Sequence, residues 1–257
     1  MSTLTIDLGR LLALVVEEVR RARRSDGAGA RTPRDPADLG RVIDHTLLRP
    51  DATGDDIDRL CREAVEYGFA TVCVNPYWVH RASRRLVGTP VGVCAVVGFP
   101  FGAQVTSVKA AEARRALADG AREIDMVVNI GALRSGDYPG VLGDIAAVAS
   151  PVASAGGCLK VILETAALDD REKVAACVLS RAAGADFVKT STGFGAGGAT
   201  VADVELLRRV VGPAMGVKAA GGIRDVEMAR VMLAAGATRI GTSAGVAIVQ
   251  ADRSRRV

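Results

Sequence analysis

The sequence predicts an α/β protein of the (β/α)8 barrel class for residues 37–257, preceded by a separate N-terminal segment. Three observations support this class. From residue 41, short apolar runs alternate with segments of helical periodicity. The helical segments commonly end in glycine just past the apolar pattern, as helices do. Eight expected strands in β-α alternation occupy roughly 215 residues, near the ~250 typical of such a barrel. A doubly wound open sheet is the alternative.

The expected elements follow the chain in regular order. Each strand is a short apolar run, and each helix is a longer amphipathic segment between two runs. The expected strands are 42–48 (VIDHTLL), 69–75 (FATVCVN), 91–99 (VGVCAVVGF), 123–130 (EIDMVVNI), 159–165 (LKVILET), 186–192 (DFVKTST), 216–222 (GVKAAGG) and 239–245 (RIGTSAG). The expected helices are 56–68, 107–120, 171–184, 201–212 and 225–236, with a short helix beginning in 242–250 (TSAGVAIVQ).

Residues 1–36 differ in composition from the barrel. Apolar side chains recur at helical spacing over 3–24, which predicts an amphipathic helix. Residues 25–36 are rich in Gly, Pro and charge and indicate a flexible linker. Four arginines in 20–24 could contact nucleic acid, but a solvated helix end is the simpler explanation. We therefore expect two units, 1–36 and 37–257.

Composition excludes several classes of protein. Net charge is +4 and aromatic content is 4%, which favours neither nucleic-acid binding nor base stacking. No apolar run is long enough to span a membrane, and the charge order around LLALVV is the reverse of a signal peptide. The five cysteines are scattered, which predicts free thiols and a cytoplasmic protein. The two histidines, His45 and His80, lie in different elements, so no metal site is expected.

Gly193, Gly195 and Gly198 have the G-x-G-x-x-G spacing of dinucleotide-binding loops. That function needs an acidic residue about 20 positions further on. No Asp or Glu lies between Glu205 and Asp225, and the motif follows the sixth expected strand, not the first. We therefore assign these glycines to a tight turn that lets the backbone approach an anion.

Two lysines lie on neighbouring strands and are expected to face the barrel interior. Side chains alternate along a strand and helix-facing positions are apolar, so Val188 and Val217 should face outward. Lys189 and Lys218 then face inward. Two ammonium groups ~5 Å apart, at an effective dielectric constant of ~20, repel by about 3 kcal/mol. This repulsion and burial both favour a neutral amine, which is a nucleophile toward carbonyl carbon.

The chain has five lysines and twenty-eight arginines, so arginine supplies most of its positive charge. Arginine cannot form a Schiff base, and inward lysines therefore indicate amine chemistry. Asp125 and Lys160 also face inward, and Lys160 is expected to pair with Asp125 and keep it ionised. Lys109 and Lys173 lie in helical segments and are expected to be surface charges.

The seventh and eighth strands end in small residues. Gly221 and Gly222 lie at the end of the seventh, and Gly241 and Ser243 lie at the end of the eighth. Loops at these two places in such barrels often bind phosphate through backbone N–H groups. We expect a phosphate site there, with ordinary turn glycines as the alternative.

Eight stretches in order resemble the deoxyribose-phosphate aldolase family over about residues 40–250. They are IDHTLLRPDAT, CVNPYWV, VVGFPFGAQVTSVKAAEA, EIDMVVNIGAL, LKVILETAAL, DFVKTSTGFGAGGAT, VKAAGGIRD and RIGTSAGV. The resemblance implies reversible cleavage of 2-deoxy-D-ribose 5-phosphate to acetaldehyde and D-glyceraldehyde 3-phosphate through a lysine Schiff base. It also implies that no metal or organic cofactor is needed, that the partners are a sugar phosphate and an aldehyde, and that the protein is a homodimer.

The resemblance assigns roles to individual residues. Lys189 matches the Schiff-base lysine, Lys218 the second lysine that keeps it partly neutral, and Asp125 the acid that relays protons with water. The other matching positions are Gly193, Gly221, Gly222, Gly241 and Ser243 for phosphate, and Asp44 and Thr46 for the pocket lining.

The chain departs from the family pattern at several places. Ala219 replaces a common proline, and Ala244 replaces a second serine, so one phosphate hydroxyl is missing. Phe194 stands where some members have lysine, and no C-terminal tyrosine follows RSRRV. The alternatives are a Schiff-base barrel aldolase for another sugar phosphate and a non-catalytic binder of phosphate or nucleic acid.

Overall fold

The computed structural model describes residues 13, 17 and 38–255. Apart from residues 13 and 17, the expected helix over 3–24 and the linker over 25–36 lie outside the described residues. Within them, no helix is long and apolar enough to cross a membrane.

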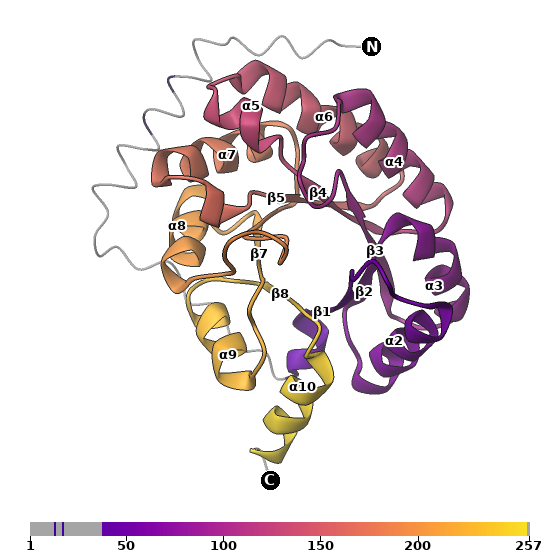
Figure 1. The fold of residues 1–257 in the computed structure, drawn as a ribbon. Helices are drawn as coiled ribbons and strands as arrows, with labels where there is room; N and C mark the ends of the chain where they lie inside the picture. The colour runs from indigo at the N-terminus through magenta and orange to yellow at the C-terminus, as the bar shows by residue number, and fades with distance from the viewer. Residues whose placement is uncertain (1–12, 14–16, 18–37, 256–257) are drawn as a thin grey trace.

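Eight parallel strands pair in sequence order and close into a barrel (Figure 1). The last strand pairs with the first, as His45 lies opposite Thr242. This confirms the predicted (β/α)8 fold and excludes the open sheet. The strands are β1 (Ile43–Leu47), β2 (Thr71–Val74), β3 (Gly92–Val97), β4 (Glu123–Val127), β5 (Cys158–Ile162), β6 (Phe187–Lys189), β7 (Gly216–Ala220) and β8 (Arg239–Thr242).

The helices surround the barrel (Figure 1). They are α2 (Gly54–Tyr67), α3 (Val79–Arg85), α4 (Thr106–Ala118), α5 (Ile130–Arg134), α6 (Tyr138–Ser154), α7 (Asp170–Ala182), α8 (Val201–Val211), α9 (Val226–Ala234) and α10 (Gly245–Ser254). Three short 3-10 turns are η1 (Leu39–Val42), η2 (Pro76–Trp78) and η3 (Thr165–Ala167).

Local sequence explains where the main helices start and stop. Helix α2 begins with a capping box, in which Thr53 and Asp56 each accept a hydrogen bond from the other's backbone N–H. Helix α7 begins with the same device between Asp169 and Glu172. Gly68 ends α2 with φ of 70°, a conformation that glycine adopts without steric cost.

Helix α6 was not expected from the sequence. It contains Gly140, Gly143 and Pro151, which weaken a helical pattern. Asp137 caps its first turn by accepting a hydrogen bond from Gly140 N at 3.0 Å. Its apolar face packs into the main core, where Val141, Ile145 and Val148 are fully buried. Tertiary burial therefore overrides weak local propensity here.

The core lies between the strands and the helices. Val188 and Val217 are fully buried in this layer, as predicted, so the alternate positions of β6 and β7 face the barrel interior. The register places Lys189 opposite Lys218 and Asp125 opposite Lys160. The barrel interior is thus lined by charged groups at the level of these residues.

The prediction that Lys109 is a surface charge is wrong. Its side chain is fully buried between α4 and α6, where its Nζ forms an ion pair with Asp144 at 2.6 Å. The same ammonium donates to the carbonyl oxygen of Val127 at 3.0 Å. Lys173 is mostly buried too and pairs with Asp203 at 2.7 Å. Amphipathic spacing does not reveal such pairs, because a lysine stem can pack against apolar neighbours.

Candidate active site

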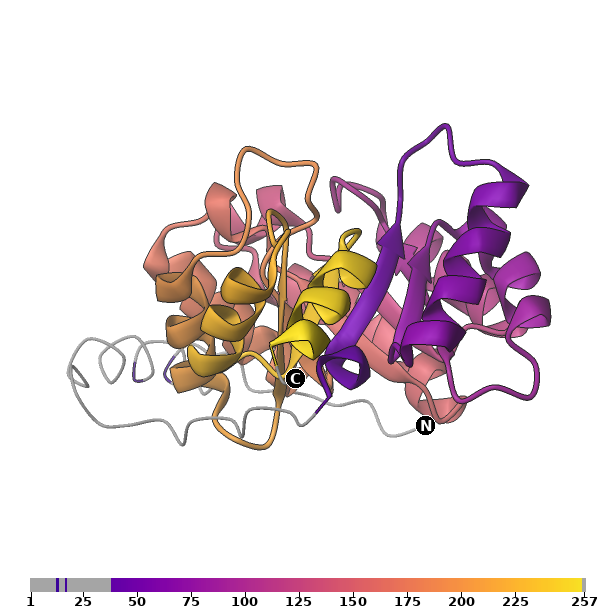
Figure 2. The same cartoon turned by 90° about the horizontal axis from the view of Figure 1, so that it is seen from below.

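A cavity of about 340 Å³ opens at the carboxyl ends of the strands. Figure 2 shows the loops after β1 and β6 standing at one end of the barrel, and residues from both line this cavity. Active sites of (β/α)8 enzymes lie at this end. The lining residues are Thr46, Leu47, Leu48, Arg49, Lys189, Thr192, Gly193, Phe194, Ala220, Gly221, Gly222, Ile223, Arg224, Gly241, Thr242 and Ser243.

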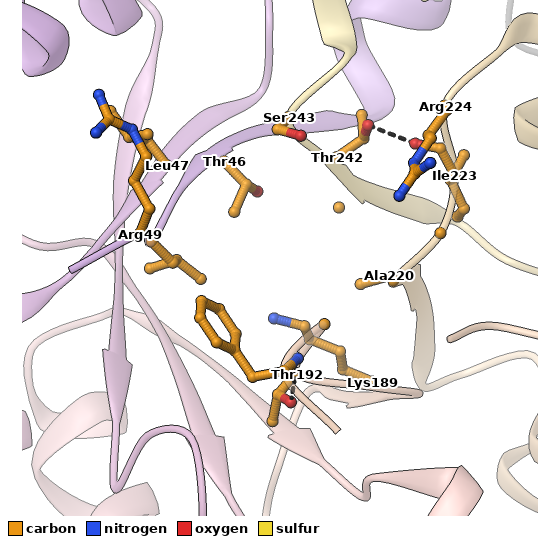
Figure 3. A pocket seen from close by; sticks show the side chains of 16 residues that line it. Thr46, Leu47, Arg49, Lys189, Thr192, Ala220, Ile223, Arg224, Thr242 and Ser243 are labelled. Carbon is orange, nitrogen blue, oxygen red and sulfur yellow. Dashed lines mark hydrogen bonds between the residues drawn. The ribbon is translucent and has the colours of Figure 1, made fainter. Parts of the chain in front are cut away.

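Lys189 brings an amine to the floor of this cavity (Figure 3). Its side chain is 3% exposed, and its Nζ lies 2.8 Å from Asp125 Oδ2. Lys218, on the neighbouring strand, is fully buried, and its Nζ lies 2.8 Å from the same oxygen. The two lysines predicted to be neighbours therefore share one carboxylate. This carboxylate offsets part of the repulsion between them, and the spacing of residues in the sequence does not reveal it.

Asp125 is the centre of a buried network of charges. Its Oδ1 accepts hydrogen bonds from Lys160 Nζ at 2.9 Å and from the Cys94 thiol at 3.1 Å. Burial opposes its charge, but Lys160, Lys189 and Lys218 outweigh burial and hold the pKa of Asp125 well below its usual range. The predicted pairing of Lys160 with Asp125 is confirmed.

Both supporting lysines stay charged. Burial disfavours the Lys218 ammonium, yet the carboxylates of Asp125 and Asp44 outweigh burial and raise the pKa of Lys218. The same opposition between burial and nearby anions raises the pKa of Lys160, which also pairs with Glu123. Lys218 and Lys160 are therefore fixed cations beneath the cavity.

Asp44 lies below the cavity and does not line it. Its side chain is fully buried and binds Lys218, while Arg239 Nη1 lies 2.6 Å from its other oxygen. Despite burial, Lys218, Lys160 and Arg239 lower the pKa of Asp44. Thr46, two residues further along β1, does line the cavity. Of the two residues matched to the pocket, the structure thus places Thr46 at the cavity and Asp44 one layer deeper.

One end of the cavity is built from glycines and small polar residues. Gly193, Gly221 and Gly222 have φ of 86°, 92° and 81°, values that favour glycine. Ser243 lies at the same end, just before helix α10 begins at Gly245. All five residues matched to phosphate binding line this cavity, since Gly241 does as well. A helix N-terminus and exposed backbone N–H groups favour an anion.

Two arginines at the cavity were missed in the sequence analysis. Arg224 and Arg49 approach it from opposite sides (Figure 3). Arg49 is held by Asp51 at 2.9 Å and by Asp56 at 2.5 Å, whereas Arg224 forms no ion pair with any residue that the structure describes. Arg224 lies two residues after Gly222, and this nearness in the sequence to the expected phosphate loop was the available signal.

Cys73, Cys94 and Asp125 place three candidate metal-ligand atoms within 4.8 Å of one another. The three lysine ammonium groups already surround Asp125. Their charge opposes the entry of another cation. These residues therefore do not fit a metal site.

The fold and the cavity together define a (β/α)8 barrel enzyme whose pocket places a lysine amine beside an anion-binding end. The sequence matches the model of the DeoC/LacD family aldolase over residues 41–251. The chain therefore belongs to this aldolase family.

Similar proteins agree with this assignment. The chain is 59% identical over 211 residues to the deoxyribose-phosphate aldolase of Brevibacillus brevis, which covers 82% of this chain and 95% of that one. It is 58% identical over 219 residues to the same-named protein of Thermococcus gammatolerans, and the match covers 84% of this chain and 97% of that one. The solved structure of deoxyribose phosphate aldolase from Aeropyrum pernix, described as a unique tetramer, is 33% identical in sequence and matches with a TM-score of 0.80. The match covers 97% of this chain and 100% of that one.

Proposed function

We propose that this aldolase reversibly cleaves 2-deoxy-D-ribose 5-phosphate to acetaldehyde and D-glyceraldehyde 3-phosphate, with Lys189 forming the Schiff base. The observation that carries the proposal is the position of Lys189. Its amine reaches the cavity, whereas Lys218 and Lys160 lie fully buried beneath it. The names of the relatives support the choice of substrate.

The charge balance inside the barrel supports Lys189 as the nucleophile. Three carboxylates of the described interior, Asp44, Glu123 and Asp125, face four bases. Arg239 cannot lose its proton, and nearby anions hold the protons of Lys160 and Lys218. The interior becomes electrically balanced when Lys189 is neutral. Lys189 is therefore the base that can give up its proton and attack a carbonyl carbon.

The proposed reaction begins with addition of Lys189 Nζ to C1 of the open-chain sugar phosphate. Loss of water gives an iminium ion. The C2–C3 bond then breaks: its electrons pass to the iminium to form an enamine, and the C3 hydroxyl loses a proton to release D-glyceraldehyde 3-phosphate. Protonation of the enamine at C2 and hydrolysis release acetaldehyde and free Lys189.

Asp125 and Lys218 support this chemistry electrostatically. The iminium nitrogen carries a positive charge where the Lys189 ammonium stood, 2.8 Å from Asp125. Asp125 thus stabilises the cation as it forms. We assign proton transfer to a water molecule held by Asp125 and Lys218, because Asp125 Oδ2 contacts both the Lys189 amine and Lys218 Nζ.

The glycine-lined end of the cavity is the proposed phosphate site. Gly193, Gly221, Gly222 and Gly241 offer close backbone approach, Ser243 offers a hydroxyl, and Arg224 adds a cation at the same end. Ala244 supplies no hydroxyl, so phosphate binding relies more on backbone N–H groups and on Arg224.

Trapping of the Schiff base tests this proposal. Borohydride with acetaldehyde should reduce the imine to a stable secondary amine, and peptide mapping should place the added mass on Lys189. Lys189→Arg keeps the charge but cannot form an imine, so it should lose essentially all activity and all label. A label on Lys218 or Lys160 would overturn the assignment of Lys189. Cleavage by wild type without any label would overturn the Schiff-base mechanism.

A Schiff-base aldolase for another sugar phosphate is the remaining alternative. The cavity's anion-binding end supports a phosphorylated substrate without selecting one sugar. Rates with a panel of sugar phosphates and aldehydes distinguish the two. Preference for a different sugar phosphate over 2-deoxy-D-ribose 5-phosphate would replace the proposed substrate.

We also propose that the protein works in the cytoplasm as a homo-oligomer. All five cysteines are free, which supports a reducing compartment. Tyr77, Phe101 and Val105 are 83%, 73% and 67% exposed, which supports contact with another copy. The expected dimer and a tetramer like that of the Aeropyrum relative are distinguished by light scattering after gel filtration.

A further inference from the structure

Glu164, which follows β5, combines two unfavourable features. Among the described residues it is the one non-glycine residue with a positive φ, at 57°. Its side chain is buried, and its Oε1 has no hydrogen-bond partner among those residues. A non-glycine residue in the left-handed region is uncommon, and an unpaired buried oxygen is unfavourable. Such features persist at functional sites, where the surrounding structure compensates for them.

The backbone around Glu164 is anchored to the strand that carries Lys189. Leu163 N donates to the carbonyl oxygen of Lys189 at 2.9 Å, and Thr165 N donates to that of Thr190 at 2.9 Å. Leu163 and Thr165 are two positions apart, yet they bind the carbonyl oxygens of two consecutive residues of the neighbouring segment. The left-handed turn at Glu164 absorbs the extra residue, as in a bulge, and directs its side chain toward the loop after β6.

The Glu164 carboxylate holds that loop from beneath. Its Oε2 accepts hydrogen bonds from Thr192 Oγ1 and, at 3.3 Å, from Thr192 N. Thr192 Oγ1 in turn accepts a hydrogen bond from Phe194 N at 3.0 Å. A Cβ on Gly195 would lie 2.9 Å from Glu164 Cδ, so the chain passes close over the carboxylate only because residue 195 is glycine.

This loop forms one wall of the cavity. Thr192, Gly193 and Phe194 line it, and Thr192 lies across from Arg224 and Ser243 (Figure 3). Lys189 lies earlier, within β6, where ladder hydrogen bonds hold its backbone. The carboxylate of Glu164 therefore bears on the shape of the wall more than on the position of the nucleophile.

We infer that Glu164 is a positioning residue for substrate binding: its buried carboxylate, acting through Thr192, fixes the Thr192–Phe194 wall against which the sugar phosphate binds. Glu164 contacts no reacting atom in this arrangement. The inference rests on the proposed function, because it takes the cavity as the sugar-phosphate site.

Two variants of Glu164 separate its carboxylate from its backbone. Glu164→Gly removes the carboxylate but accepts the positive φ, so the folded backbone at this position is not strained. We expect this variant to raise KM for 2-deoxy-D-ribose 5-phosphate at least tenfold with a smaller change in kcat. Glu164→Gln keeps the shape and one acceptor oxygen and should raise KM less.

A matched pair at Thr192 tests the same wall from the other side. Thr192→Val removes the hydroxyl that links Glu164 to Phe194 and should raise KM as Glu164→Gly does. Thr192→Ser keeps the hydroxyl and should recover most of the loss. This pair decides the question if Glu164→Gly fails to fold.

Borohydride trapping with acetaldehyde separates this inference from the proposed function. Acetaldehyde carries no phosphate, so the variants should be labelled at a rate close to that of wild type. Failure to label wild type would refute the Schiff base at Lys189. Normal labelling of wild type together with an unchanged KM in Glu164→Gly and Thr192→Val would refute the role of Glu164. Equal losses of labelling, kcat and melting temperature would also refute it, because they indicate a general structural role.

Discussion

Replacing Lys218 with methionine should slow imine formation at Lys189 about a hundredfold. The Nζ atoms of Lys189 and Lys218 each lie 2.8 Å from Asp125 Oδ2, so they are at most twice that distance apart. With an effective dielectric constant of about 20, two positive charges about 5.6 Å apart repel by about 3 kcal/mol, which is about a hundredfold in an equilibrium constant. Without the Lys218 cation, this repulsion no longer opposes an ammonium group paired with Asp125, and the nucleophilic free amine becomes scarcer. Imine formation needs the free amine and therefore slows.

The assay is the rate of borohydride trapping with acetaldehyde at one fixed pH, together with the initial rate of cleavage. The trapping rate reports imine formation separately from the later proton transfers. Lys218→Arg is the control, because it keeps a cation beside Lys189 and should keep the trapping rate near that of wild type. An unchanged trapping rate in Lys218→Met would refute the reasoning. An equal loss in Lys218→Arg would show that geometry, not charge, sets the rate.

Three further predictions concern stability, phosphate and metal. Lys109→Met should lower Tm by about 10 °C. Removing one partner of a buried ion pair costs about 3–5 kcal/mol, and each kcal/mol shifts Tm by about 2–4 °C in a domain of this size. A Tm within about 2 °C of wild type, measured by calorimetry, would contradict the importance of the ion pair between Lys109 and Asp144. Gly222→Asp should raise KM for the phosphorylated sugar more than Gly222→Ala does, because both share the backbone strain at φ of 81° but only one adds a negative charge; equal KM values would argue against phosphate at this end. Prolonged treatment with EDTA should leave cleavage intact, because the lysines around Asp125 oppose a bound cation; loss of activity restored by a divalent ion would show that a metal is required.

Much of the barrel follows from local pattern. The apolar runs predict all eight strands, although the runs extend beyond several of them. The run over 186–192 contains β6, which ends at Lys189, and its last residues belong to the loop that lines the cavity. An apolar or hydroxyl side chain buried in a loop looks the same in sequence as one buried in a strand, so periodicity cannot locate the strand end.

The sequence by itself determined the fold class, the inward direction of Lys189, Lys218, Asp125 and Lys160, and the small residues at the ends of β7 and β8. These features depend on alternation along a strand and on residue type, both of which are local. The tertiary structure alone decided that one oxygen of Asp125 binds both lysines, and that Asp44 lies beneath the cavity. It also decided that Glu164 turns under the loop after β6. These are contacts between strands and loops far apart in the chain, and closure of the barrel sets their distances.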